Sequence, residues 1–491
     1  MYKIIKRSEL LKSHLIDLDN KNIQTPKGQQ LQHIIKSLTS FSLESKNNNN
    51  ILWGRIQGTQ EEEKALLFIQ KELSFYNFDY IKYEKFPCFQ KQWKPTKCAI
   101  LAKSLNHEYT FHTAITAFES ATTPQEGLTA KCVFVGTGTK LELEGKNLNN
   151  KFVLLKADCY PNALLNSARR AFLRIAETTK ALGVIIYWQN PINTPIAGRV
   201  GTPMGGDAKG GVLPWISISR DEGIQLRQLL ENDPNLDITL NIQGEMEERK
   251  SGHVLAFIKG KSEKTILLTM HVDGYFYAIH DNGAGVAIGM ELAKYFSQKN
   301  QTELPYSLLF HFSGDHEVPG AGGTRIIGNN QELMKNILVA YQIEHIFSPI
   351  LVEESGILWL SNAQNPQSIF VSHGHNGLKE LLLSAALKFN IPYLNSISKD
   401  PTGDIQGLYP PFAPNKKLLS AGFIEGSVYY HSQADGELNF ITDTALENTY
   451  NLYQYILEES LKKQQDFYDN DKDFEDHLFT SQFIKNIYNT F

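Results

Sequence analysis

The sequence predicts an α/β fold in which a mixed, mainly parallel sheet is flanked by helices and interrupted by an inserted α/β segment. Two observations support this prediction. From Ser251 onward, short apolar runs typical of buried strands alternate with longer helical segments, and this alternation favours a mainly parallel sheet. Between about 106 and 250, a separate series of strands, helices and a loop rich in glycine and proline breaks that rhythm.

These changes in pattern divide the chain into four expected segments. The main domain consists of residues 1–105 and 251–465. The insertion covers 106–250, and a polar tail covers 466–491. The main domain begins with polar helical residues at 8–45. A further helix is expected to start near Glu61–Glu63, because acidic residues favour the first turn of a helix.

Apolar runs of strand length occur in both the insertion and the main domain. In the insertion they lie at 151–157 and 184–188, and the helix between them is expected to end at Gly183. In the main domain they lie at 253–260, 264–270, 307–312, 337–343 and 368–372. Ligands of such sheets gather beyond the carboxyl ends of the strands. Polar residues that follow these runs are therefore candidates for a functional site.

Composition excludes several classes of function. The net charge is −5 and no basic stripe is present, which argues against a nucleic-acid partner. The four cysteines contain no CxxC pair, which argues against a disulfide framework and a cysteine zinc site. No apolar run reaches the ~18–20 residues that span a bilayer, so no membrane partner is expected. The N-terminus lacks a Sec signal pattern, which predicts a cytoplasmic protein or export by another route.

Five candidate metal ligands end predicted strands or follow them closely. In chain order they are His271, Asp281, Glu317, Glu344 and His431. Two imidazoles and three carboxylates suit a pair of zinc ions in which one carboxylate bridges. Two metals about 3.5–4 Å apart can activate water and polarise a carbonyl at once. The pattern therefore predicts a hydrolase of the peptidase type that binds two zinc ions.

The first two ligands lie in a compact pattern. His271 is followed two residues later by Asp273, a carboxylate that can orient groups around the metal from outside the ligand set. Asp281, Asn282 and Gly283 then open a predicted helix. Asp281 is also a good helix N-cap, so this aspartate alone would be weak evidence for a metal. The combination of both motifs is more specific than either one.

The remaining ligands occur in settings that metal binding explains. Glu317 lies in a polar cluster where a residue able to accept a proton from water should precede the ligand. Glu344 ends an apolar strand, where a carboxylate without a partner would be costly. His431 follows Tyr430, whose hydroxyl could donate to a developing oxyanion.

With these motifs, the chain resembles the co-catalytic zinc exopeptidase family that includes bacterial leucyl aminopeptidases, glutamate carboxypeptidase and the transferrin-receptor relatives. The resemblance extends from GRIQGT at 54–59 to the helix after YYHSQAD at 429–435, and the insertion resembles a protease-associated domain. It implies that Asp281 bridges the metals, that His271 and Glu344 are ligands of one or other ion, and that the other two candidates complete the set.

The family pattern contains two adjacent glutamates, of which the first is the general base and the second is a metal ligand. This sequence departs from the pattern there. An alignment without gaps places His316 and Glu317 there, so His316 becomes the base. A slip of one residue would instead make Asp315 the base and His316 the ligand. We prefer the first alignment, because it keeps the following glycine turn intact. Where relatives carry a substrate-pocket motif, only Asp404 remains, so substrate preference cannot be transferred.

The resemblance implies a zinc-dependent exopeptidase, with aminopeptidase activity favoured over carboxypeptidase activity, and a peptide as substrate. A homodimer is left open. An alternative is a family member that has lost catalysis and acts as a binding protein, which the altered base keeps open. A third reading is a structural scaffold in which the motifs are only helix caps and hydrogen-bonded polar residues. It would require all five candidate ligands to occur in this order by coincidence.

Overall fold

The computed structural model describes most of the chain. The described residues are 5–6, 24–104, 107–116, 120–157, 166–189, 192–198, 213–317, 322–345, 348–354, 357–365, 367–398, 401–425, 429–437 and 441–468. The sequence predictions for 8–23 and for the tail beyond 468 lie outside these residues. Within them, no helix is both long enough and apolar enough to cross a membrane.

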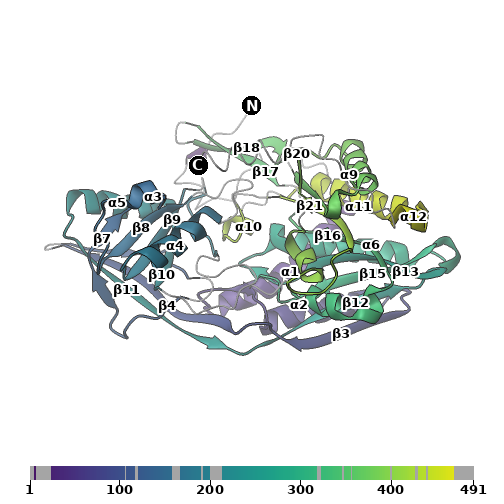
Figure 1. Cartoon of the computed structure of the whole chain (residues 1–491), viewed down its shortest axis with the longest axis horizontal. Coiled ribbons are helices and arrows are strands. Elements are labelled where there is room, and N and C mark those ends of the chain that lie inside the picture. The colour runs from purple at the N-terminus through teal and green to yellow at the C-terminus, as the bar shows by residue number, and fades with distance from the viewer. Residues whose placement is uncertain are drawn as a thin grey trace.

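A mixed eight-stranded sheet forms the centre of the main domain (Figure 1). In spatial order its strands are β20 (Tyr393–Ser398), β19 (Gln367–Val371), β21 (Leu419–Ile424), β16 (Ile337–Ile343), β13 (Ser262–His271), β15 (Tyr306–Ser313), β12 (Lys250–Ile258) and β3 (Tyr80–Pro87). The central strand β13 runs parallel to both of its neighbours, β15 and β16. At one end of the sheet, β12 pairs antiparallel with β15 and with the edge strand β3. The predicted mixed sheet is confirmed, and the apolar runs predicted as strands form β12, β13, β15, β16 and β19.

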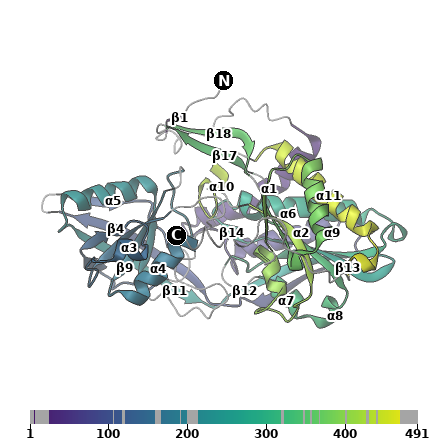
Figure 2. The same cartoon turned by 45° about the horizontal axis from the view of Figure 1, so that its top comes forward.

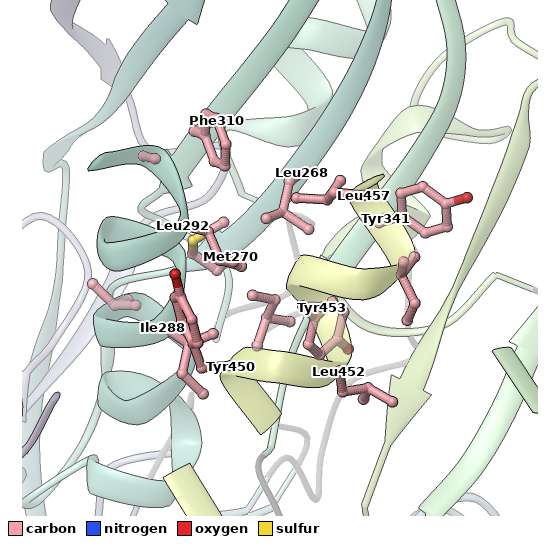
Figure 3. Packing of buried hydrophobic residues seen from close by; sticks show 14 of the residues in the cluster. Leu268, Met270, Ile288, Leu292, Phe310, Tyr341, Tyr450, Leu452, Tyr453 and Leu457 are labelled. Atoms are coloured by element: carbon pink, nitrogen blue, oxygen red, sulfur yellow. The ribbon is translucent and has the colours of Figure 1, made fainter. Parts of the chain in front are cut away.

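Alternating side chains of the sheet bury its two faces against different helices. On one face, Leu268 and Met270 pack with Ile288 and Leu292 of α6 and with Tyr453 of α11 (Figure 3). Helices α1 (Pro26–Asn47), α2 (Gln60–Leu73), α6 (Ala284–Ser297), α9 (Asn376–Lys388) and α11 (Asp443–Lys462) contribute to this core. Each buried large apolar side chain contributes roughly 1.5–3 kcal/mol. This packing holds the carboxyl ends of β13, β15 and β16 in fixed positions.

The opposite face of the sheet has a smaller core. Leu267 and Leu309 point to this side and pack with Ile327, Ile405 and Leu408. The last three residues come from the short helices α7 (Thr324–Asn329) and η5 (Gly403–Leu408), which lie close to α8 (Gln331–Met334). This small layer brings the segment around 403 to the site described below.

A second lobe contains two four-stranded sheets. One has the order β10 (Trp215–Ile218), β9 (Gly183–Trp188), β8 (Phe152–Ala157) and β7 (Cys132–Phe134), and its strands are parallel. The other has the order β5 (Glu108–Phe111), β4 (Gln92–Lys103), β11 (Asp237–Glu247) and β6 (Leu128–Ala130), and its strands are antiparallel. Its helices are α3 (Lys140–Leu143), α4 (Asn166–Thr178) and α5 (Arg220–Asn232). Because β4 pairs with β11 along its length, this pairing starts before the expected boundary at 106.

Smaller elements lie between and beside the lobes. They are β1 (Ile5–Lys6), β17 (Pro349–Glu354), β18 (Ile357–Gln364), β2 (Gly54–Arg55), β14 (Gly274–Tyr275), η2 (Ile279–Gly283), η3 (Gln301–Glu303), η4 (Ser372–Gly374), α10 (Ala434–Glu437) and α12 (Gln465–Tyr468). In both views, α10 lies between the second lobe and the main sheet (Figures 1 and 2). The chain just before α10 carries His431.

One local prediction, and the alternative role of Asp281 as a helix cap, differ from the structure. The helix of the insertion ends at Thr178, and Gly183 instead begins β9, because the intervening residues form a turn. Asp281 is not the N-cap of α6. That position is Gly283, and Asp281 has extended backbone dihedrals within the turn before the helix. The carboxylate of Asp281 is therefore not used as a helix cap.

Candidate metal centre

The five predicted ligands meet at the carboxyl edge of the main sheet. His271 ends β13, Asp281 lies in the turn before α6, Glu317 follows β15, Glu344 follows β16 and His431 precedes α10. Their side chains are buried. Parallel strands direct their carboxyl ends to one edge of the sheet, so residues far apart in sequence come together there.

Asp281 lies between two histidines. The distance from His271 Nε2 to Asp281 Oδ1 is 3.0 Å, and the distance from His431 Nε2 to Asp281 Oδ2 is 3.2 Å. His431 Nε2 also lies 2.8 Å from Glu317 Oε2. Candidate ligand atoms of His271, Asp281 and Glu317 lie within 4.8 Å of one another. One carboxylate thus faces an imidazole with each of its oxygens, as a bridging ligand would.

Glu344 lies on the His271 side of the centre. Its carboxylate forms a second group with His271 and His316, and the candidate ligand atoms of this group also lie within 4.8 Å of one another. Glu344 Oε1 is 3.7 Å from His316 Nε2, and Glu344 Oε2 accepts a hydrogen bond from the Asp404 amide at 3.2 Å.

The donor atoms fit a metal pair. The Nε2 atoms of His271 and His431 and both carboxylate oxygens of Asp281 are buried and have no hydrogen-bond partner. Such groups are normally satisfied, because burying them unpaired costs free energy. A cation would satisfy the imidazole lone pairs and the carboxylate at once. Neutral imidazole and carboxylate oxygen together are a ligand set that suits zinc.

The surroundings keep the Asp281 carboxylate ionised. Burial alone would raise the pKa of Asp281, but the nearby imidazoles of His345, His271 and His431 outweigh burial and hold this pKa well below its ordinary value. The main chain adds support, because the amide of Asp281 donates to Asp435 Oδ2 at 3.2 Å. A negatively charged group is thus maintained at the centre of the site.

Asp273 orients its neighbours through both its main chain and its side chain. Its carbonyl oxygen lies 3.0 Å from His271 Nδ1, and its carboxylate oxygen Oδ2 accepts hydrogen bonds of 2.9 Å from the amides of His316 and Glu317. The position of Asp273 outside the ligand set stays a prediction. The residue fixes the turn that carries Glu317.

His316 and Asp315 point in different directions. The His316 ring stacks on His271 with a centroid distance of 4.1 Å, and His316 Nδ1 lies 2.8 Å from Asp404 Oδ1. Asp315 instead accepts a hydrogen bond of 2.9 Å from the Phe89 amide, and burial raises the pKa of Asp315 to about 8. This arrangement fits the ungapped alignment, in which Glu317 is a ligand. The assignment stays a prediction.

Tyr430 lies beside the centre. Its ring stacks on His431 with a centroid distance of 3.6 Å, and it meets the ring of His345 at 5.4 Å in an edge-on arrangement. Its predicted role as a hydrogen-bond donor to substrate stays a prediction.

Sequence reasoning missed several supporting groups, because their partners are distant in the chain. Fully buried Arg55 donates to the carbonyl oxygens of Val272 and Ala278 at 2.8 and 2.9 Å. Buried Glu62 accepts a hydrogen bond of 3.0 Å from the Asp315 amide. Glu62 was expected only as an acidic residue at a helix start. Asp435, which accepts a hydrogen bond from the Asp281 amide, is the supporting group that a sequence motif indicated, because it ends YYHSQAD.

The second lobe reaches the site directly. The amide of Ala197 donates to the His431 carbonyl at 2.8 Å, and the Ala197 carbonyl lies 2.9 Å from His431 Nδ1. A cavity of about 550 Å³ is lined by residues of both lobes, including Lys46, Trp53, Ile115, Thr194 and Gln433, and none of the five candidate ligands lines it.

Comparison with known proteins supports this fold. Residues 253–456 match the model of Peptidase family M28, so the resemblance seen in the sequence motifs is confirmed over this part of the chain. The matched range contains all five candidate ligands. No curated protein matches the chain by sequence.

Solved structures match a larger share of the chain. The zinc aminopeptidase BSAP from Bacillus subtilis is 19% identical with a TM-score of 0.62, and the match covers 89% of this chain and 97% of that one. A peptidase M28 precursor from Shewanella amazonensis SB2B is 17% identical with a TM-score of 0.64 and the same coverage. The aminopeptidase from Aneurinibacillus sp. strain AM-1 is 19% identical with a TM-score of 0.58, covering 88% and 93%. These matches show that most of the chain shares the fold of those proteins.

Proposed function

We propose that this protein is a zinc-dependent exopeptidase, acting as an aminopeptidase, that hydrolyses peptide bonds at a centre for two zinc ions. The observation that carries the proposal is the buried Asp281 carboxylate, which faces His271 with one oxygen and His431 with the other. The match to Peptidase family M28 supports the reaction class. The similarity of the fold to two aminopeptidases supports the choice of aminopeptidase.

The donor set divides into two halves around Asp281. His271 and Glu344 would hold one ion together with Asp281, and Glu317 and His431 would hold the other. When bound, two zinc ions lower the pKa of water and polarise the carbonyl that is attacked. The remaining steps depend on groups of the chain itself.

His316 is the proposed general base. Its Nδ1 faces the Asp404 carboxylate at 2.8 Å, and its Nε2 points to the side of the centre where Glu344 lies. A carboxylate at Nδ1 holds an imidazole in one tautomer and stabilises the imidazolium that forms when Nε2 accepts a proton. His316 and Asp404 can thus perform together the task that a glutamate performs in the family pattern.

The other groups position the substrate. Tyr430 stacks on His431 and is the proposed donor to the oxyanion that forms when water attacks the peptide carbonyl. The second lobe is proposed as a protease-associated domain that lies over one side of the centre. Its contact with His431 at Ala197 supports this placement. The absence of nucleic-acid partners stays a prediction.

The proposal is tested by metal analysis and a peptide panel. The zinc-replete protein should contain two zinc ions per chain and release single amino acids from peptides with a free N-terminus. Peptides with a blocked N-terminus should resist, and chelation should abolish release until zinc is restored. Less than one zinc per chain, or no release from any peptide, would count against the enzyme. Two bound zinc ions without release would favour the inactive binding protein.

A further inference from the structure

A third histidine contacts Asp281. His345 Nε2 lies 3.1 Å from Asp281 Oδ1, the same oxygen that faces His271 Nε2 at 3.0 Å. The imidazole of His431 faces the other oxygen of Asp281. His345 is 4% exposed, and its Nε2 atom is buried without a hydrogen-bond partner. The sequence motifs gave no sign of this residue.

The two expected ligand histidines share one arrangement. His271 Nδ1 faces the carbonyl oxygen of Asp273 at 3.0 Å, and His431 Nδ1 faces the carbonyl oxygen of Ala197 at 2.9 Å. A carbonyl oxygen can only accept, so each Nδ1 carries the proton. The other ring nitrogen, Nε2, then faces Asp281 and is the nitrogen available to bind a cation. Histidines that bind metal are commonly oriented by such a hydrogen bond from their other nitrogen.

His345 has the same arrangement. Its Nδ1 faces the carbonyl oxygen of Glu425 at 2.6 Å, which places a proton on Nδ1 and leaves Nε2 as the nitrogen that faces Asp281. The ring is held by stacking on His280 with a centroid distance of 5.2 Å, and by the edge-on contact with Tyr430. An imidazole nitrogen and a carboxylate oxygen at this separation repel each other unless a proton or a metal ion lies between them.

The distances fit a shared cation. Zinc lies about 2.0–2.2 Å from nitrogen and oxygen ligands, so two ligands of one tetrahedral ion lie about 3.3–3.5 Å apart. The separations of 3.0 and 3.1 Å from Asp281 Oδ1 to the two imidazoles are close to this value. His345 Nε2 is also 3.9 Å from Glu344 Oε1, another member of the same half of the centre.

We propose that His345 is a ligand of the ion on the His271 side of Asp281. This inference rests on the proposed two-zinc function and deepens it. That half of the site then offers four ligands, namely His271, Glu344, His345 and Asp281, whereas the His431 half offers three. Closed four-ligand zinc sites are typical of tightly held ions, and three-ligand sites leave a position for water. The two ions should therefore differ in affinity, with the ion on the His271 side held more tightly.

Zinc X-ray absorption of the wild-type chain counts the imidazoles. At one equivalent of zinc the expected result is two imidazoles on the ion. At two equivalents it is three imidazoles shared by two ions. A count of one imidazole per ion overturns the inference. The matched control is His316→Gln, which removes the other nearby imidazole and should leave the count unchanged. A count that falls in this control would make His316 the ligand and would also overturn the inference.

Affinity gives a second readout. His345→Gln should weaken the tighter zinc by more than ~100-fold in a chelator competition, because even outer groups around a metal typically contribute 10–100-fold. Unfolding of both metal-free proteins shows whether the variant folds. If the His345→Gln variant does not fold, the imidazole counts of the wild-type and His316→Gln proteins decide whether His345 is a ligand. A folded His345→Gln variant that binds the tighter zinc with wild-type affinity overturns the inference.

The failure of this inference can be separated from failure of the proposed function. A wild-type chain that binds less than one zinc overturns both. A chain with two zinc ions, amino-acid release from peptides and one imidazole per ion keeps the proposed function and overturns the role of His345 alone.

Discussion

Single residues at this centre differ in task although they lie within a few ångströms of one another. His271 and His316 stack face to face, yet their Nδ1 atoms have different partners. A main-chain carbonyl orients His271, whereas the Asp404 carboxylate faces His316 at 2.8 Å. A carbonyl fixes a tautomer, but a carboxylate also stabilises positive charge on the ring. The partner of Nδ1 therefore separates a proposed ligand from a proposed base.

Substitution of His316 tests this division. We expect His316→Ala to retain near-normal zinc content and to lower kcat by ~10²–10⁴-fold, as is typical when a general base is removed. Metal analysis and kinetics on one preparation give both values. The control is Asp315→Ala, because that side chain faces the Phe89 amide rather than the centre. If His316→Ala loses zinc while Asp315→Ala stays full but slow, the base is Asp315.

Gly403 allows Glu344 its position. Its φ is +66°, and a Cβ there would lie 1.6 Å from Glu344 Oε2. We expect Gly403→Ala to displace this carboxylate and to lower zinc affinity by at least ~10-fold, in line with effects of groups that orient ligands. Gly145→Ala is the matched control, since Gly145 has φ +73° but no atom within 4 Å of a Cβ. Equal zinc affinity in both variants would show that the contact with Glu344 is unimportant.

At the scale of elements, β12, β15 and β13 are joined by a buried polar chain beneath the site. His253 Nδ1 lies 3.0 Å from His311 Nε2, and His311 Nδ1 lies 3.1 Å from Thr269 Oγ1. Burial lowers the pKa of His253, and burial together with His253 holds the pKa of His311 well below its ordinary value. Both histidines are thus neutral where the unfolded chain would already bind protons.

The sign of the pH dependence follows from these lowered pKa values. Above about pH 6.5, both states leave the two histidines neutral, and the pair adds no pH dependence. Below about pH 6.5, the unfolded state binds more protons than the folded state. The free energy of unfolding therefore falls by up to ~1.4 kcal/mol for each histidine per unit decrease in pH. Denaturant unfolding of metal-free protein between pH 7 and 5 should show this slope. The slope should be smaller in His311→Gln, and an unchanged slope would exclude His311 as its source.

At the scale of the whole molecule, the two lobes meet at the metal centre. The long strands at the lower edge of Figure 1 connect them, and α10 lies between them in both views. The contact at Ala197 makes the second lobe part of the support for His431, although it supplies no candidate ligand. The lobe that would cover the substrate thus also orients a group that binds metal.

Ala197→Pro tests this coupling between the lobes. Proline removes the amide that donates to the His431 carbonyl at 2.8 Å. We expect weaker binding of the second zinc, by roughly 10–100-fold, with the first zinc unaffected. Ala197→Gly keeps the amide and should bind both ions normally. Normal zinc titration in the proline variant would show that the second lobe does not support the site.

The sequence predicted the mixed sheet and the positions of the five candidate ligands along it. Both rest on local patterns, namely runs of apolar residues and polar residues just after them. The same rule missed His345. In an extended strand, successive side chains point to opposite faces, so a residue next to Glu344 is expected to point away from it. In the structure His345 has φ +51°, and this left-handed turn brings both neighbours to the same side.

The sequence by itself determined which strands exist, which polar residues end them and which reaction class they suit, because these properties depend on residue type and short spacing. Only the tertiary structure decided which groups face one another. The carbonyls that orient His431 and His345 come from residues 197 and 425, and the carboxylate beside His316 comes from residue 404. Such contacts depend on how distant segments pack around the sheet, and no local spacing encodes them.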